Sequence, residues 1–391
     1  MPITLEASTL TPGDVVGGYR LIRPLGRGGF GEVFEARHPG EDRLVAIKVL
    51  TRYEAAGAGF VQRFRDEARL LSRIDSPHVV RIYAVGELPG GAPYIVMEHF
   101  ADGALSYLLK RGPLPLERAV KIMGDLLVAL DAAHRQGVIH RDVKSSNVLI
   151  DVAGDRAALC DFGIARSAIP MEGEAPATGR SVLGTPHYTP PERLLRARDG
   201  STRREDPRSD LYSAGVIFYR MLAGQRPFEA HSGDALAVAR AVLMGDVPPL
   251  PEMVPPEMQA VCMQLLARTP DGRYASAREA LKALARTWAR VSRTEVMQRA
   301  PIPEEGHSMQ IADTTPSPPP GLSAGLPAAW LYTREEAPTV RTPTPVELLQ
   351  VDEPSSSPTR QSKAASWWPV VILTGLLLVA TLIARWRAPD L

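Results

Sequence analysis

Two short segments restrict the fold and chemistry of this chain more than any other feature. Residues 140–147 read His-Arg-Asp-Val-Lys-Ser-Ser-Asn, and residues 161–163 read Asp-Phe-Gly. Together they supply a candidate proton acceptor, a candidate cation and two candidate oxygen ligands, which are Asp142, Lys144, Asn147 and Asp161. Two oxygen ligands of this kind suit a Mg²⁺ ion that also binds phosphates. A loop acid or a packed core histidine would explain single members of the set, but chance does not readily explain the whole set in this order.

A glycine-rich stretch at residues 26–31 reads Gly-Arg-Gly-Gly-Phe-Gly. A plain turn between strands is one explanation for such a triplet of glycines. A dinucleotide-binding fold would place a helix directly after the glycines, whereas here the β-type stretch Val33-Phe34-Glu35-Ala36 follows. Glycines between two antiparallel strands let the backbone lie close over phosphates, so we expect a hairpin that covers a nucleotide.

A lysine follows three apolar residues in the stretch Val45-Ala46-Ile47-Lys48. A lone lysine of this kind is often a surface residue. Here, however, Glu67 follows on a segment with the apolar spacing of a helix, Phe64, Ala68 and Leu71. A strand lysine held by a helix glutamate would direct a cation at phosphate oxygens.

The periodicity of apolar residues predicts a small sheet-rich region followed by a larger helical one. The expected strands are residues 19–25, 32–38, 44–50, 80–87 and 93–98, with a helix at 60–73. The clearest helices beyond residue 100 are 116–136, 208–223 and 256–266.

With these motifs in order, the sequence resembles the bacterial members of the eukaryotic-type, or Hanks-type, serine/threonine protein kinase family. The resemblance covers about residues 13–290. It implies an α+β, two-lobed protein kinase fold, with a sheet-rich N-lobe at about 13–98 and a helical C-lobe at about 101–290. It also implies ATP in the cleft, with Mg²⁺ as the metal and Mn²⁺ as an alternative.

The resemblance assigns a role to each motif residue. Asp142 would be the catalytic aspartate that orients the substrate hydroxyl and accepts its proton, and Lys144 would stabilise the γ-phosphate. Lys48, paired with Glu67, would orient the α- and β-phosphates. The metal ligands would be Asn147 and Asp161. The ATP-binding positions, which cover phosphates, sandwich adenine or form the hinge, would be Leu25, Gly26, Arg27, Gly28, Gly29, Phe30, Gly31, Val33, Ala46, Lys48, Met97, Glu98, Phe100 and Leu149.

Further positions match structural residues of the family. Asp210 resembles the buried aspartate that holds the catalytic loop, and Glu192 and Arg273 resemble an ion pair that anchors the activation segment. Cys160 directly precedes Asp161 and should line the rear of the nucleotide pocket as a small apolar filler, with a redox role as the alternative. Cys262 should pack in a helix.

Protein serine or threonine is the implied substrate class, because Lys144 is the serine/threonine signature and residues 184–192 resemble the segment on which protein substrates dock. In this family the arginine at position 141 commonly meets a phosphate on the activation segment. The hydroxyls available there belong to Thr178, Ser181 and Thr185. Autophosphorylation of Thr178 or Ser181 is therefore the expected activating step, with a structural role for Thr185.

The C-terminal quarter has a different composition. Residues 301–363 hold 12 of the 36 prolines, so residues 291–363 are expected to be an extended linker. Ala364 to Ala384 carry no formal charge and would span about 31 Å as a helix, which predicts a transmembrane helix at 364–386. Residues 1–12 and 387–391 would be short tails. No signal peptide is recognisable, so a cytoplasmic kinase domain on a single-pass anchor in a bacterial inner membrane is expected.

Charge and cysteine content exclude other classes. Forty-five Lys and Arg against 44 Asp and Glu give no support to nucleic-acid binding, and two cysteines are too few for a disulfide scaffold. One local exception is the arginine-rich stretch 193–208, which is either a solvated loop or a contact for acidic substrates or anionic lipids.

Alternatives to the leading interpretation stay open at this point. A catalytically inactive pseudokinase scaffold would be expected to have lost one of the motif residues, and all of them are present. Thr339, Thr342 and Thr344 in the linker could become docking sites for phosphothreonine-binding proteins, or the linker could be a simple spacer. The resemblance also leaves homodimerisation open.

Overall fold

The computed structural model describes residues 10–27, 31–50, 60–162, 186–199, 206–231 and 233–299. The chain divides into two units, residues 1–339 and 340–391, and every described residue belongs to the first. Both the proline-rich part of the predicted linker and the predicted transmembrane helix at 364–386 lie outside the described residues. Within the described residues, no helix combines the length and the apolar character needed to cross a bilayer.

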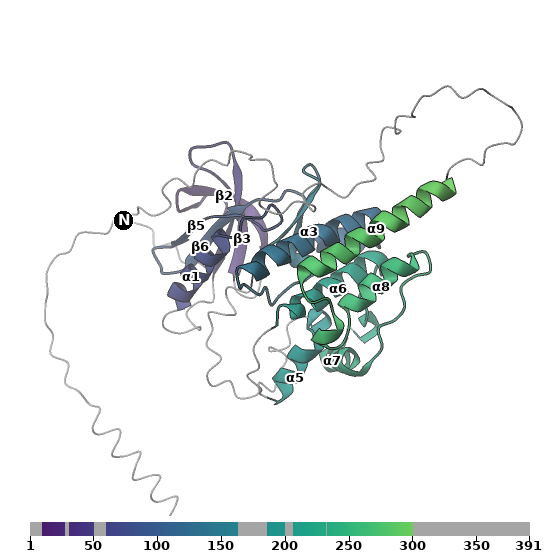
Figure 1. The fold of residues 1–391 in the computed structure, drawn as a ribbon. Helices are drawn as coiled ribbons and strands as arrows, with labels where there is room; N and C mark the ends of the chain where they lie inside the picture. The colour runs from purple at the N-terminus through teal and green to yellow at the C-terminus, as the bar shows by residue number, and fades with distance from the viewer. Residues whose placement is uncertain are drawn as a thin grey trace, which may run out of the picture. The chain divides into compact units, whose positions relative to one another are not determined.

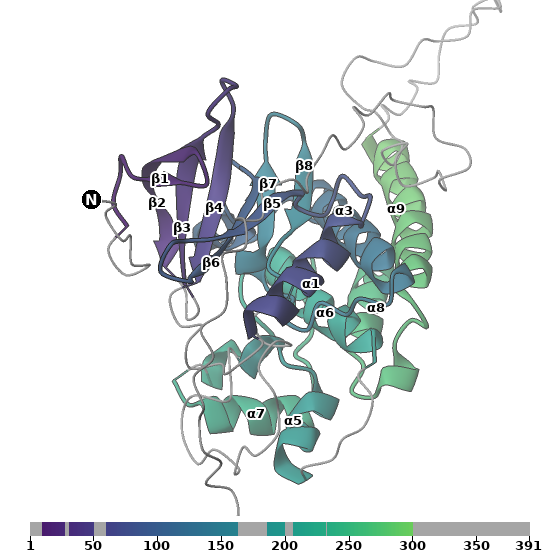
Figure 2. The ribbon, with the colours of Figure 1, turned by 90° about the vertical axis from the view of Figure 1, so that its left-hand side faces the viewer.

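The N-terminal part is one antiparallel sheet with a helix beside it (Figures 1 and 2). Its strands are β1 (Val15–Val16), β2 (Tyr19–Arg27), β3 (Gly31–Arg37), β4 (Leu44–Leu50), β5 (Ile82–Glu87) and β6 (Pro93–Glu98). They lie in the order β1-β2-β3-β4-β6-β5, so the last two strands are exchanged relative to the chain order. Helix α1 (Phe60–Ser72) lies between β4 and β5 in the sequence.

Alternation of side chains gives this sheet two apolar faces. On one face, Phe34 and Ile47 belong to a cluster of buried residues contributed by β1 to β4 and β6. On the other, Leu50 and Ile95 pack against Phe64 of α1. Apolar side chains therefore hold α1 against the end of the sheet at which the chain leaves β4.

The C-terminal part is mainly helical. Its helices are α2 (Leu105–Leu108), α3 (Leu116–Arg135), α5 (Pro191–Asp199), α6 (Arg208–Ala223), α7 (Ala235–Met244), α8 (Pro256–Leu265) and α9 (Ala277–Arg299). A two-stranded hairpin, β7 (Val148–Asp151) and β8 (Arg156–Leu159), and short 3₁₀ turns η2 (Leu109–Arg111), η3 (Ser145–Asn147), η4 (Pro186–Tyr188), η5 (Glu229–His231) and η6 (Pro270–Gly272) complete it. Helix α6 is buried along most of its length and packs against α3 and α8, and α9 lies along α3 (Figure 1).

This architecture confirms the two-lobed fold, and two boundaries differ from the sequence-based expectation. Residues 191–199, expected to open a loop, form helix α5, in which Leu194 is buried. Helix α9 continues through residues 291–299, which were assigned to the linker. Val291 is 6% exposed and extends the buried stripe of Leu284, and the first proline of the linker comes only at Pro301.

We predict that Gly31→Ala destabilises the N-lobe. A Cβ at Gly31 would lie 2.0 Å from the carbonyl oxygen of Val49 on β4, so the strands would have to separate. The expected loss is about 2–3 kcal/mol, or a melting temperature lower by roughly 5–10 °C. Gly26→Ala is the matched control, because a Cβ at Gly26 would meet no atom within 4 Å. Equal melting temperatures for the two variants in differential scanning fluorimetry would contradict the prediction.

Candidate active site

One face of the N-lobe sheet carries the predicted nucleotide-binding side chains. Val33 on β3 lies opposite Lys48 on β4, and Ala46 on β4 lies opposite Met97 on β6. Directly opposed residues of antiparallel strands point to the same face, and so do residues two apart on one strand. Register alone therefore places these four side chains together, with Lys48 nearest the glycine-rich hairpin.

The β7–β8 hairpin brings the two candidate metal ligands together. Asn147 directly precedes β7, Asp161 follows β8, and the amide of Cys160 donates a hydrogen bond of 2.9 Å to the carbonyl oxygen of Asn147. Asp161 has a φ of +57°, in the left-handed region that a residue with a side chain rarely adopts. Strain of this kind persists where surrounding contacts hold the residue, and it is common at functional sites.

Lys48 contacts Asp161 across the cleft. Its Nζ lies 2.7 Å from Oδ1 of Asp161. Burial is the largest single influence on Lys48 and lowers its pKa, but the charge and hydrogen bond of Asp161 together with other nearby acidic groups raise it more, so the net pKa of Lys48 is raised. Burial is also the largest single influence on Asp161 and raises its pKa, but the charge and hydrogen bond of Lys48 together with other nearby basic groups lower it more, so the net pKa of Asp161 is lowered. The sequence predicted an ion pair between Lys48 and Glu67, and the structure corrects this partner. In the described residues the carboxylate that Lys48 contacts is Asp161.

The catalytic loop holds its polar groups in one cluster. Lys144 Nζ lies 2.7 Å from Oδ2 of Asp142. The side-chain Nδ2 of Asn147 donates a hydrogen bond to the backbone oxygen of Asp142 at 2.9 Å. Because Nδ2 of Asn147 is used in this way, the Oδ1 atom is the one left to bind a metal ion.

A single buried carboxylate anchors this loop from behind. Asp210 on α6 accepts hydrogen bonds from the backbone amides of His140 at 2.8 Å and Arg141 at 3.0 Å, as the sequence predicted. Nε2 of His134 on α3 donates a third at 2.9 Å. Burial is the largest single influence on Asp210 and raises its pKa, but the interactions with His134 and the backbone amide and ring of His140 together lower it more, so the net pKa is lowered. The sequence analysis missed His134, because a histidine on the apolar face of a helix has no local motif.

His140 connects the catalytic loop to the segment that carries Asp161. Its ring is fully buried and lies 4.5 Å from the ring of Phe162. The amide of Asp142 donates to Nδ1, so Nε2 carries the proton that is donated to the carbonyl oxygen of Cys160 at 2.9 Å. Burial lowers the pKa of His140, and the ring is therefore a neutral structural element at pH 7.

The residues expected to form the floor and rear of a nucleotide pocket are apolar. Val80, Phe100, Ala158 and Cys160 form one buried cluster, against which the side chains of Met97 and Leu149 pack. Burial raises the pKa of the Cys160 thiol well above its usual value, so the thiol is protonated. This confirms Cys160 as an apolar filler, and Cys262 is a buried free cysteine in α8.

The predicted ion pair between Glu192 and Arg273 is present. Nη1 and Nη2 of Arg273 each donate to one oxygen of Glu192 at 2.8 Å, and the arginine side chain is fully buried. Arg273 also donates to the backbone oxygen of Ala267 at 2.8 Å. This pair fastens the start of α5, and with it the segment that follows residue 186, to the helical core.

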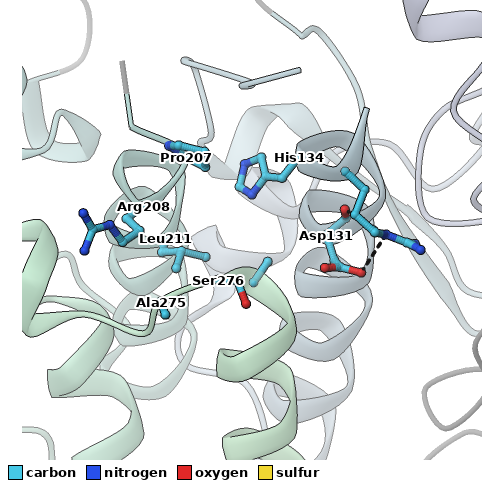
Figure 3. A pocket seen from close by; sticks show the side chains of 9 residues that line it. Asp131, His134, Pro207, Arg208, Leu211, Ala275 and Ser276 are labelled. Atoms are coloured by element: carbon cyan, nitrogen blue, oxygen red, sulfur yellow. Dashed lines mark hydrogen bonds and ion pairs between the residues drawn. The ribbon is translucent and has the colours of Figure 1, made fainter. Parts of the chain in front are cut away.

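A shallow cavity of about 230 Å³ lies beside His134, whose ring donates to the anchoring aspartate (Figure 3). It is lined mainly by α3, the start of α6 and the residues before α9, which contribute Asp131, His134, Arg135, Pro207, Arg208, Leu211, Ala275, Ser276 and Ala277. The carboxylate of Asp131 is already paired with Arg135 at 3.1 Å. The cavity thus reaches the rear support of the catalytic loop rather than the nucleotide site.

The residues present fit a nucleotide phosphate chain with a divalent cation. A side chain at Gly26 would meet no protein atom, so packing does not explain this glycine, whereas close approach of a phosphate to the backbone would. Among the described residues, no group of three or more His, Cys, Asp and Glu residues could hold a metal alone. A cation between Asn147 and Asp161 would therefore need further oxygen ligands, which phosphates supply.

Several predicted positions lie outside the described residues. They are the loop residues Gly28, Gly29 and Phe30 and the candidate phosphorylation sites Thr178, Ser181, Thr185, Thr339, Thr342 and Thr344. Of the arginine-rich stretch, residues 200–205 also lie outside. Arg208 is held by Asp206 and Asp271, each at 2.8 Å, so this member of the stretch is not a free contact for an anion.

The amino-acid sequence of this chain is similar to those of known protein kinases. The protein kinase domain model matches residues 19–288, more than half of the chain. The serine/threonine-protein kinase pkn2 of Myxococcus xanthus is 43% identical over 224 residues, which are 56% of this chain and 26% of that protein. PknL of Mycobacterium tuberculosis is 38% identical over 263 residues, 66% of this chain and 63% of that protein. The chain thus spans less than two thirds of these relatives.

A solved structure shares the fold. A mutant of the PknI kinase domain of Mycobacterium tuberculosis superposes with a TM-score of 0.53 at 27% sequence identity. The match covers 71% of this chain and 99% of the PknI chain. The part of this chain that matches is therefore a complete domain of that kind.

We predict that Glu192→Gln lowers the melting temperature in a pH-dependent way. Burial is the largest single influence on Glu192 and raises its pKa, but the hydrogen bond and charge of Arg273 together with the hydrogen bond of Ser209 lower it more, so the folded-state pKa lies below the unfolded value of 4.5. The carboxylate therefore stabilises the fold fully above pH 4.5, and its contribution declines as the pH falls through the folded-state pKa. At pH 7 the variant should lose about 3 kcal/mol, or roughly 6–12 °C, because Arg273 keeps a buried charge.

The difference between wild type and Glu192→Gln should narrow below pH 4.5. Thermal scans at pH 7.0, 5.5, 4.5 and 4.0 would measure it. Glu279→Gln is the control, since Glu279 pairs with Lys282 at an exposed position and should change little at any pH. A pH-independent difference would mean that the charge of Glu192 is not what stabilises the pair.

Proposed function

This chain belongs to the protein kinase domain family, and we propose that it transfers the γ-phosphoryl group of ATP to serine and threonine hydroxyls of proteins. One observation carries the proposal: Lys48 of β4 contacts Asp161 although 113 positions separate them, and the catalytic-loop residues Asp142 and Asn147 are bonded to each other beside the β7–β8 hairpin that leads to Asp161. The named relatives that the chain resembles are serine/threonine-protein kinases.

Each group in the cleft has a chemical task in this reaction. Asp142 would orient the acceptor hydroxyl and take its proton, and Lys144, 2.7 Å away, would place a positive charge where negative charge develops. Lys48 would orient the phosphates from the sheet side. A Mg²⁺ ion held by Asn147 and Asp161 would neutralise phosphate charge when bound. The buried apolar cluster around Phe100 would receive the adenine ring.

We predict that Asp142→Asn lowers phosphate incorporation roughly 100- to 10,000-fold, because the amide cannot accept the hydroxyl proton. The measurement is transfer from radiolabelled ATP to a generic protein substrate and to the chain itself, with Mg²⁺ or Mn²⁺. Glu279→Gln, at an exposed position, is the control and should match wild type. Phosphopeptide mapping of the wild type should find modified residues between positions 163 and 185.

The same experiment addresses the alternative of a scaffold without turnover. Wild type and Asp142→Asn with equally low incorporation, combined with nucleotide binding, would favour the scaffold. Equal and high incorporation would instead mean that a contaminating kinase was measured.

We also propose that residues 364–386 anchor the chain in a bacterial inner membrane, with the kinase domain in the cytoplasm, where ATP is available. The support is the uncharged run between Lys363 and Arg385, and the tryptophans at positions 367, 368 and 386, since indole rings favour the headgroup region. The linker threonines would then lie between the domain and the bilayer, within reach of the active site.

We predict that Leu376→Arg combined with Leu378→Arg moves the full chain from the membrane to the soluble fraction. Each arginine at the centre of a spanning helix costs about 2.5–3.5 kcal/mol on insertion. Fractionation of expressing bacteria, with an alkaline wash of the membranes, would measure the shift. Ser355→Arg with Ser356→Arg adds the same charge to the linker and should leave the chain membrane-bound. Retention of the double leucine variant in washed membranes would contradict the anchor.

A further inference from the structure

An arginine near the end of α6 connects the catalytic loop to the segment after residue 186. Arg220 is half-buried, and its Nη1 donates to Oγ of Ser145 at 3.2 Å and to the hydroxyl of Tyr188 at 3.3 Å. The two hydroxyls lie 3.0 Å apart and complete a three-membered network. Among the described residues, no carboxylate lies within ion-pair distance of Arg220, and its Nε and Nη2 have no hydrogen-bond acceptor.

This arginine differs from its neighbours in the helical lobe. Arg273 is paired with Glu192, Arg226 with Glu229, and Arg208 with Asp206. Each of these guanidinium groups is partly or fully buried and is compensated by a carboxylate. A guanidinium has five N–H donors and never loses its charge in proteins, so partial burial without an anion is costly. The position of Arg220 is therefore suited to an anion that comes from outside the described residues.

A second unpartnered group lies beside it. His187 in η4 is 6% exposed, and its buried Nδ1 has no hydrogen-bond partner in the part of the chain described. Burial lowers the pKa of His187, the charge of Arg226 lowers it further, and Arg220 acts in the same direction against the opposing charge of Glu229. Glu229 compensates the charge of Arg226, whereas the described residues offer Arg220 hydroxyl groups and no carboxylate. Nδ1 of His187 is buried from solvent.

The position of the network relates it to the protein substrate. Ser145 directly follows Lys144, whose Nζ contacts Asp142, the candidate proton acceptor. Tyr188 belongs to the segment 184–192, which resembles the segment on which protein substrates dock. The uncompensated charge therefore lies between the residues that would handle the acceptor hydroxyl and those that would hold the flanking chain.

We propose that Arg220 is a specificity-determining residue whose guanidinium binds the carboxylate of an Asp or Glu close in sequence to the phosphorylated Ser or Thr. This inference rests on the proposed kinase function and adds the substrate class, acidic protein segments. Guanidinium–carboxylate hydrogen bonds are charge-assisted and directional, so they discriminate strongly between an acidic and a basic side chain at one position.

The test compares peptides that differ at one position. Each peptide has one Ser in a neutral background, with Glu, Gln or Lys placed singly at each of the four positions on either side. For the full-length wild type, kcat/KM for Glu should exceed that for Lys on the order of tenfold at one position at least. In Arg220→Gln that ratio should fall to about one, and in Arg220→Glu it should fall below one. Arg118→Gln, which removes an arginine paired with Asp155, should keep the wild-type ratio.

Binding measurements separate this inference from the kinase function itself. The same peptides, labelled with a fluorophore, are titrated into full-length Asp142→Asn and into Asp142→Asn combined with Arg220→Glu. The preference for Glu should be present in the first and absent or reversed in the second, whether or not transfer occurs. Three results would overturn the inference: ratios near one at every position for wild type, an unchanged ratio in Arg220→Glu, or a uniform loss across all peptides. The last would mean that Arg220 organises the docking segment or binds a group of this chain.

Discussion

The buried carboxylate of Asp210 is the constraint on which the rest of the site depends. It accepts hydrogen bonds from the backbone amides of two successive catalytic-loop residues and from an imidazole of α3. One side chain of α6 therefore joins α6, the catalytic loop and α3. The second of those amides belongs to Arg141, whose φ of +68° is unfavourable for a residue with a side chain. Hydrogen bonds to a buried anion stabilise that conformation, and it is this turn that places Asp142 at the cleft.

The charged side chains of the site are paired with one another. The lysine of β4 and the aspartate after β8 contact each other across the two lobes, and the lysine of the catalytic loop contacts the catalytic aspartate. Pairing of this kind keeps partly buried ions together at moderate cost. It also means that groups expected to hold phosphates and metal already lie side by side. Beside the catalytic loop, Arg220 is an exception, because the described residues around it offer hydroxyls but no carboxylate.

The sequence was sufficient to predict most of the fold and most members of the site. Alternating and helical periods located β2 to β6 and the helices α1, α3, α6 and α8 to within a few residues, since these periods report which side chains are buried. The long helix α9 was not among the expected helices. The partner of Lys48 could not be predicted in this way. The position of α1 relative to the sheet depends on how Phe64 and Ala68 pack against Leu50 and Ile95, and motif spacing says nothing of that packing. His134 and Arg220 were missed because their partners are distant in the sequence.

The sequence by itself determined which chemical groups the chain carries, their order, and which of them share a strand face or a loop. Those properties follow from covalent neighbours and from the geometry of regular secondary structure. Only the tertiary structure decided which charges meet. Ion pairs and hydrogen bonds form or fail over differences of an ångström or two, and such differences are set by the packing of apolar side chains far from the charges themselves. For that reason the sequence did not predict that Lys48 contacts Asp161, or that the described residues around Arg220 include no carboxylate partner.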